Sequence, residues 1–409
     1  MTPTKPSRPS RKPGEPRVDD GPGKPRVDDS LRIARVDDDF DRVDDVVGER
    51  DDAVVGGQVD DELAAAPVDV FTLPPGADPT LDWGLDAHLQ ADRSPRIIER
   101  HLLVPPELTG LRLDHFVKTQ IPRLSRTRIQ GIIGGQLRRS DGHVPKPATI
   151  VAAGEHYVIR RPAQAEPPCP RTFGVVVRDA RLYVVDKPAG LPVHASAKFY
   201  FNTLTRVMSE RFPDEPELQI CHRLDRETSG CLVVARDRAA AAEIKHAFGT
   251  KDAVTKQYLA VVHGQPPWDA VHTIDLPLRV AQPGDPTKLT HVRMLTGPGG
   301  LPAITKVRVE RRAGAYALVR CTLLTGRQHQ IRAHLAAEGF PIVGDKLYAH
   351  GDDAFLRFCN EGLVPELARR FVLWRHALHA ARVAFPHPDG GIVTAEAPLP
   401  PDLARLLED

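Results

Sequence analysis

The densest group of polar residues in the sequence lies between two apolar runs near the middle of the chain. It reads Cys221-His222-Arg223-Leu224-Asp225-Arg226-Glu227-Thr228-Ser229-Gly230 and continues directly into the apolar residues 231–234. Asp225 should therefore lie at the edge of a protein core, where a carboxylate needs a cation or hydrogen-bond donors to stay charged. Arg223 and Arg226 are the local candidates. A carboxylate held in this way can act as a nucleophile or as a general base.

This block resembles the H-R-L-D-x-x-T-S-G signature of the RluA-type pseudouridine synthases, and every fixed position matches. Two further blocks resemble that family in the expected order. They are KQYLA at residues 256–260, for the pattern K-x-Y-x-A, and TGRQHQIRAH at residues 325–334, for T-G-R-x-H-Q-I-R-x-H. Supporting stretches lie at residues 185–194, 341–348 and 376–380. The resemblance covers roughly residues 100–405.

The resemblance implies a role for each matched residue. Asp225 would be the catalytic aspartate, and Tyr258 would stack on the target uracil. Arg332 would pair with Asp225 and keep it ionised, while Arg223 would help to hold the nucleotide flipped out of its stack. The reaction detaches uracil at N1 and rejoins it through C5, with the carboxylate either attacking or removing a sugar proton. Neither step needs a redox group, so we expect no cofactor and no metal.

Two alternative functions use the same residue types. The first is a non-catalytic RNA-binding or ribosome-assembly factor that keeps the fold. Loss of Asp225, Tyr258 or Arg332 would favour this alternative, but all three are present. A glycoside hydrolase also uses aspartate, but that reaction typically needs a second acid. Glu227 lies in the block, yet the family pattern makes it a variable position. The sequence therefore favours the isomerase.

The elements that must position these blocks are expected in one catalytic domain, residues 171–405. Short β-type runs lie at residues 182–185, 231–234, 258–262 and 318–324, and helical stretches lie at about 238–248 and 327–338. The strands outnumber the helices and do not alternate with them regularly. This pattern predicts an α+β fold with a mixed, largely antiparallel sheet. Residues 351–374 have no interpretation.

Residues 96–162 are basic, with 12 basic and 5 acidic residues from 96 to 161. The order of elements reads helix, turn, helix and short strands, with Ser125 as the N-cap of the second helix. The segment resembles the S4 RNA-binding module through RLDHFV, PRLSRTRIQGIIGGQLRRSDG and VPKPATIVAAGEHYVI. A phosphate-binding face is expected from arginines near the start of that second helix and in the strand after it. They are Arg123, Arg126, Arg128, Arg138 and Arg139.

Residues 1–95 are expected to be a disordered acidic tail. The sequence RVDD occurs four times, and residues 15–62 hold 17 acidic and 7 basic residues. Large apolar residues are sparse, so the segment cannot bury enough surface to offset the entropy of ordering. It is either a solvated tail or an acidic arm that competes with RNA. The net charge of +1 for the whole chain hides this uneven distribution.

The remaining features concern compartment and partners. The five cysteines form no C-x-x-C pair, so neither a zinc site nor a disulfide framework is expected. The basic N-terminus has no apolar run behind it, and no apolar stretch approaches the ~20 residues of a membrane span. We expect a cytoplasmic monomer without a membrane partner. Its partner should be RNA, with large-subunit ribosomal RNA favoured by the resemblance and transfer RNA as the alternative.

Overall fold

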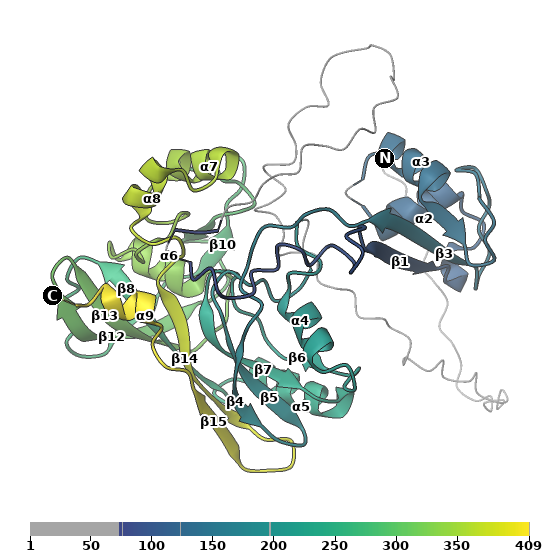
Figure 1. Cartoon of the computed structure of the whole chain (residues 1–409). Coiled ribbons are helices and arrows are strands. Elements are labelled where there is room, and N and C mark those ends of the chain that lie inside the picture. Colours follow the sequence, from purple (N-terminus) through teal and green to yellow (C-terminus); the bar gives the residue numbers. More distant parts are fainter. Residues whose placement is uncertain (1–72, 76, 123, 196–197, 409) are drawn as a thin grey trace, which may run out of the picture. The chain divides into compact units, whose positions relative to one another are not determined.

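The computed structural model of the chain describes residues 73–75, 77–122, 124–195 and 198–408 (Figure 1). The four RVDD repeats, and with them most of the predicted acidic tail, lie outside the described residues, as does Arg123. All five cysteines lie in the described ranges, and none of them forms a disulfide bond there. Within the described ranges, no helix has the length and apolar character needed to cross a bilayer.

The segment 77–95, which the sequence analysis placed in the tail, packs against the large domain instead. The side chain of Trp83 is buried, and its carbonyl oxygen accepts a hydrogen bond from the backbone N–H of Cys169 at 3.1 Å. The side-chain amide of Asn202 donates to the carbonyl oxygen of Gly84 at 3.1 Å. The predicted boundary at residue 95 is therefore too late. A single buried tryptophan and a few backbone hydrogen bonds fix this stretch, and composition averaged over 95 residues does not reveal them.

A small N-terminal module follows, in which two helices pack on a three-stranded antiparallel sheet of order β1-β3-β2. Its elements are β1 (Ile97–Leu103), the 3-10 helix η3 (Pro106–Leu108), α2 (Leu113–Gln120), α3 (Arg126–Gly135), β2 (Leu137–Arg139) and β3 (His156–Pro162). The Ser125 hydroxyl accepts from the N–H of Arg128 at 3.2 Å, which confirms the predicted N-cap. Phe116, Ile129 and Ile133 are buried between helices and sheet. Strand β1 was not predicted.

The large domain is built on a ten-stranded sheet (Figure 1). Its strands are β4 (Gly174–Arg178), β5 (Leu182–Lys187), β6 (Gln219–Ile220), β7 (Ser229–Ala235), β8 (Thr255–His263), β9 (His272–Asp275), β12 (Ile304–Ala313), β13 (Tyr316–Leu323), β14 (Leu378–Pro386) and β15 (Ile392–Glu396). The order is β4-β5-β7-β14-β8-β13-β12-β9, with β6 beside β7 and β15 beside β14. Among the strands that the structure describes, only β14 and β7 pair in parallel. The predicted mixed, largely antiparallel α+β sheet is therefore confirmed.

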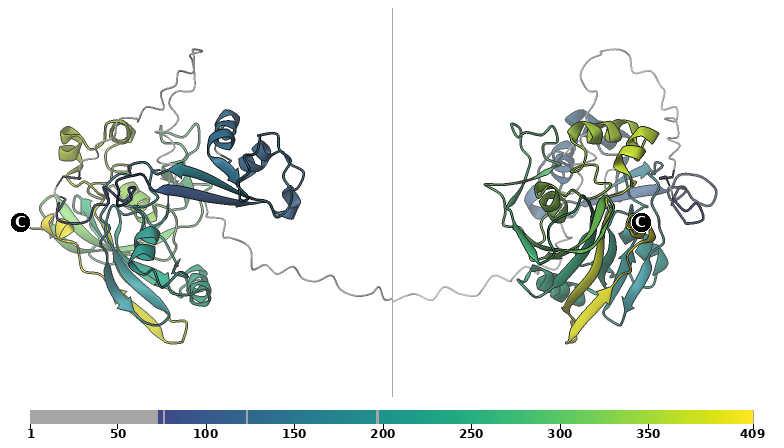
Figure 2. Two further views of the ribbon diagram at one scale, coloured as in Figure 1. Left: turned by 45° about the vertical axis from the view of Figure 1, so that its right-hand side comes forward. Right: turned by 90° about the vertical axis from the view of Figure 1, so that its left-hand side faces the viewer.

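Helices and a small second sheet complete the large domain. They are α4 (Leu204–Arg211), α5 (Arg238–Gly249), α6 (Gln330–Ala337), α7 (Asp352–Glu361), α8 (Pro365–Phe371), α9 (Pro401–Arg405) and the pair β10 (Leu278–Val280) and β11 (Met294–Thr296). Helix α5 begins at its N-cap Asp237 and packs against β7 and β14. Helices α7 and α8 occupy the stretch 351–374 that had no interpretation, and Figure 2 shows them side by side. Their contact buries Ala354, Leu367 and Phe371.

Strand β14 lies between β7 and β8 and approaches β7 closely. Gly230 of β7 has a φ of 109°, and a Cβ atom there would collide with the carbonyl oxygen of Ala380 in β14. Only glycine fits such a site without strain. All seven residues of β7 are buried. The loop that enters β7, which carries Asp225, is therefore attached to a rigid part of the core.

Candidate active site

The loop from Cys221 to Thr228 is held on one side by Lys187, at the end of β5. This lysine is fully buried, and its ammonium group donates to the carbonyl oxygens of Pro188 and Leu191, both at 2.9 Å. It also donates to the carbonyl oxygen of Arg226 at 3.1 Å. Burial lowers the pKa of Lys187 to about 7. The backbone directly after Asp225 is thus fixed to strand β5.

Glu227 holds the other side of the same loop. Its carboxylate oxygens accept from the ammonium group of Lys346 at 2.8 and 2.9 Å, and one also accepts from the backbone N–H of His376 at 3.0 Å. The hydroxyl of Thr228 shares a hydrogen bond of 2.7 Å with Nε2 of His376. Glu227 is therefore occupied as an anchor of the loop. This removes it as the second acid that a glycoside hydrolase would need.

Asp225 itself is partly open, and 19% of its side-chain surface is exposed. Its Oδ2 accepts from Nη1 of Arg332 at 3.0 Å, whereas Oδ1 accepts no hydrogen bond from the residues that the structure describes. Burial would raise the pKa of Asp225, but the nearby His329 ring and the Arg332 guanidinium outweigh it and lower the pKa below its usual value. Asp225 is therefore ionised at neutral pH, with one oxygen held and the other available.

Arg332 lies in the first turn of α6 and binds a second carboxylate more extensively. Its Nε and Nη2 donate to Oδ2 and Oδ1 of Asp345 at 2.7 and 3.0 Å. Asp345 is fully buried and also accepts from the backbone N–H groups of Leu347 and Tyr348. Asp345 was not among the predicted site residues. A buried arginine has five N–H donors to satisfy, and that count is the signal by which a second partner of Arg332 could have been expected.

Tyr258 lies in the middle of β8, opposite Cys321 of β13, and only 8% of it is exposed. Burial raises the pKa of its hydroxyl, and the negative charge of Asp225 raises it further. The phenol is therefore neutral at physiological pH. This electrostatic effect indicates that Tyr258 and Asp225 lie in the same region of the large domain.

The residue before α6 also faces this region. His329 adopts a φ of 51°, which is uncommon for a residue with a side chain. It is the N-cap of α6, so the helix begins at Gln330, three residues later than predicted. Its Nδ1 shares a hydrogen bond of 3.2 Å with the hydroxyl of Tyr348. Burial and the charge of Arg332 lower the pKa of His329 to about 4, so its ring is neutral at pH 7.

The structure brings Asp225, Tyr258 and Arg332 together from three separate parts of the chain. Arg223, the fourth residue predicted to bind the substrate, is exposed two positions before Asp225. Burial lowers the pKa of His194, and the positive charge of Arg223 lowers it further, so Arg223 lies close to the loop after β5. Arg223 is therefore an exposed cation in the same loop as Asp225.

The arginines predicted to bind RNA differ in their surroundings. Arg126 and Arg128 are exposed in the first turn of α3. Arg138 is partly buried, and its Nη1 donates to the carbonyl oxygen of Leu137 at 2.8 Å. The Arg139 guanidinium forms ion pairs with Asp141 at 2.6 Å and with Glu155 at 3.1 Å. The surface of the module therefore offers Arg126 and Arg128 most openly.

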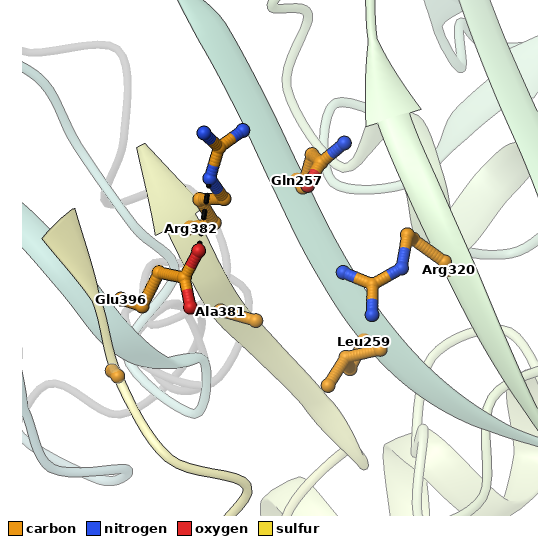
Figure 3. A pocket seen from close by; sticks show the side chains of 7 residues that line it. Gln257, Leu259, Arg320, Ala381, Arg382 and Glu396 are labelled. Carbon is orange, nitrogen blue, oxygen red and sulfur yellow. Dashed lines mark ion pairs between the residues drawn. The ribbon is translucent and has the colours of Figure 1, made fainter. Parts of the chain in front are cut away.

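A separate hollow of about 390 Å³ lies on the other face of the sheet (Figure 3). It is lined by Gln257, Leu259, Arg320, Ala381, Arg382, Glu396 and Ala397. Successive side chains of a strand point to opposite faces, so Gln257 and Leu259 face away from the side of Tyr258. None of the predicted site residues lines this hollow. The described part of the chain holds no group of three or more His, Cys, Asp or Glu residues that could bind a metal ion.

Comparison with known proteins gives consistent matches. The family model for RNA pseudouridylate synthase matches residues 181–337. A protein of Xanthomonas campestris named ribosomal large subunit pseudouridine synthase D is 34% identical over 315 residues, which covers 75% of this chain and 91% of that protein. A protein of the same name from Pseudomonas aeruginosa is 34% identical over 76% of this chain and 95% of its own length. Among solved structures, Human RNA Pseudouridylate Synthase Domain Containing 1 is 28% identical, with a TM-score of 0.44, over 57% of this chain and 86% of that one.

Proposed function

The chain belongs to the RluA-type RNA pseudouridine synthases, and from this premise we propose that it isomerises uridines of large-subunit ribosomal RNA with Asp225 as the catalytic group. The curated relatives of about one-third identity carry the name ribosomal large subunit pseudouridine synthase D. The observation that carries the role of Asp225 is its hydrogen bonding. Arg332 holds Oδ2 at 3.0 Å, while Oδ1 is left for the substrate among the described residues.

The proposed chemistry follows from these surroundings. The target uridine leaves its stack, which costs a few kcal/mol, and its base lies against the ring of Tyr258. The N1–C1′ bond breaks, the C5–C1′ bond forms, the proton at C5 is lost and N1 gains a proton. Ionised Asp225 either attacks the nucleoside or removes a sugar proton through Oδ1. The buried walls around Tyr258 keep the detached uracil from diffusing away.

Binding of the RNA is proposed to involve both parts of the chain. Arg223, an exposed cation in the same loop as Asp225, would hold the backbone of the extruded nucleotide. The N-terminal module would act as an S4-like RNA-binding module, with Arg126 and Arg128 on phosphates and with Arg123, Arg138 and Arg139 adding to that face. Arg139 would have to exchange its contacts with Asp141 and Glu155 for a phosphate. Such phosphate contacts make affinity strongly dependent on salt.

The proposal is tested by mapping pseudouridines in cellular RNA with carbodiimide labelling and primer extension. RNA from a strain that lacks the gene is compared with RNA from the same strain carrying the wild type or Asp225→Asn. We expect sites in large-subunit ribosomal RNA to vanish on deletion and to return only with the wild type. If sites vanished in transfer RNA alone, the proposed substrate would change to transfer RNA, whereas the proposed reaction would stand. Restoration by Asp225→Asn would refute the role of that residue.

A further inference from the structure

We propose that Asp345 is a positioning residue that divides the Arg332 guanidinium between two carboxylates, so that Asp225 keeps one oxygen available for the reaction. The proposal rests on the proposed catalytic role of Asp225 and extends it to a residue that never touches the substrate.

The geometry of the three side chains carries this inference. A guanidinium binds a carboxylate most strongly through two parallel N–H groups. In Arg332 the pair Nε and Nη2 is taken by Asp345 at 2.7 and 3.0 Å. Asp225 receives only Nη1, at 3.0 Å, on its Oδ2. Asp225 is thus the more weakly bound of the two carboxylates. Asp345 occupies the edge of the guanidinium that could otherwise donate to both oxygens of Asp225.

Asp345 is fixed so that it can keep this hold. Its side chain has no exposed surface, and its Oδ1 also accepts from the N–H groups of Leu347 at 3.0 Å and Tyr348 at 3.1 Å. Gly344 has a φ of 75°, and a Cβ atom there would collide with the carbonyl oxygen of Arg375. The turn before Asp345 is therefore tightly packed, and the carboxylate cannot follow Arg332 if the arginine moves.

The charge balance at Asp225 depends on the same arrangement. The charged and titratable groups that act on it are His329 just before α6, Arg332 of α6, Asp345 after α6, Tyr258 of β8 and Lys187 of β5. Among these, Asp345 offsets the positive charge of Arg332. Without it, the guanidinium is free to turn and clamp Asp225 through two N–H groups. Both oxygens of Asp225 would then be occupied, and its reactivity would fall although RNA could still bind.

The first test is Asp345→Asn. The amide oxygen can still accept from the N–H groups of Leu347 and Tyr348, but the amide nitrogen replaces the acceptor for Nε of Arg332. We expect kcat to fall by about ten- to a hundredfold, as for a small misplacement of a reacting group. The KM for RNA should stay unchanged. The assay is release of tritium from ribosomal RNA labelled at C5 of uridine. Unchanged kcat, in an enzyme that Asp225→Asn inactivates, would overturn the proposal.

One further variant separates positioning from folding. Asp402→Asn is the matched control, because Asp402 binds the buried Arg375 through the same two N–H groups, at 2.7 and 2.9 Å. It should lower thermal stability but leave kcat near the wild-type value.

An equal fall in kcat in Asp345→Asn and Asp402→Asn would show that Asp345 has a structural role only. Activity retained by Asp225→Asn would instead refute the proposed function, and the inference about Asp345 would fall with it. The two failures are thus distinguished by the Asp225→Asn control alone.

Discussion

Removing Lys346 should destabilise the loop that carries Asp225 more than removing any surface cation. In the substitution Lys346→Met, the ammonium group that donates to both oxygens of Glu227 is lost, and so is its 2.6 Å hydrogen bond to the carbonyl oxygen of Trp374. Methionine has a similar length and no charge. Glu227, two residues after Asp225, would then be left as a carboxylate without its cation.

The size of the effect follows from burial. The side chains of Lys346 and Glu227 are only 5% and 14% exposed. Removal of one partner from a buried ion pair costs roughly 3–5 kcal/mol. Glu227 retains the N–H of His376 at 3.0 Å and a longer ion pair with Arg226 at 3.7 Å. We therefore expect a loss in the free energy of unfolding near the lower end of that range, about 3 kcal/mol.

Urea unfolding at pH 7, followed by circular dichroism, measures this loss. Arg357→Met is the matched control, because Arg357 pairs with Glu361 and Glu366 at the surface, where such pairs contribute at most about 1 kcal/mol. The double variant Lys346→Met with Glu227→Gln leaves no charge stranded and should regain most of the lost stability. If Lys346→Met lost no more stability than Arg357→Met, the anchoring role of this pair would be refuted.

Three further predictions concern the aromatic ring, buried histidines and RNA affinity. Tyr258→Ala should lower kcat/KM roughly 5- to 150-fold, the equivalent of ~1–3 kcal/mol of base stacking, whereas Tyr258→Phe should stay close to the wild type. If single-turnover assays showed the same loss of activity in both variants, the stacking role of Tyr258 would be contradicted. Burial lowers the pKa of His329 and of His379 to about 4, so between pH 6.5 and 4 the unfolded chain binds protons that the folded chain does not. Stability should therefore fall as pH drops through that window. If the melting temperature of His379→Gln depended on pH as strongly as that of the wild type, burial of His379 would not be a cause of this fall. Arg126→Ala should weaken RNA binding for all sequences alike and reduce the slope of log K against log salt by about 1, as titrations at several salt concentrations would show.

The parts of the site that the sequence predicted are those carried by continuous motifs. Asp225 and Arg332 are 107 positions apart, yet each lies in a block whose residue types and order are specific, and the structure joins them. Asp345 and Lys346 lie in a stretch that was noted only as supporting the resemblance. Their roles depend on which cation meets which carboxylate after folding, and a linear pattern does not contain that pairing.

The fold was predictable to a similar depth. Buried strands such as β7 and β8 and the cap at Ser125 follow from local patterns. The helices α7 and α8 were not predicted, because their apolar faces are short and pack mainly on each other and on neighbours distant in sequence. Trp83 shows the same limit, since a single buried residue in a polar stretch gives no periodic signal.

The position of β14 has a consequence for the order in which the enzyme can form. Asp225 precedes β7 and Tyr258 lies in β8, and these strands are joined only through β14, which spans Leu378–Pro386. During synthesis on a ribosome, both residues emerge more than a hundred positions before the strand that sets their spacing. Such non-local pairing is slow to form. We therefore expect the nascent chain to hold two half-sheets that β14 has not yet joined, and to become active only after β14 has been released.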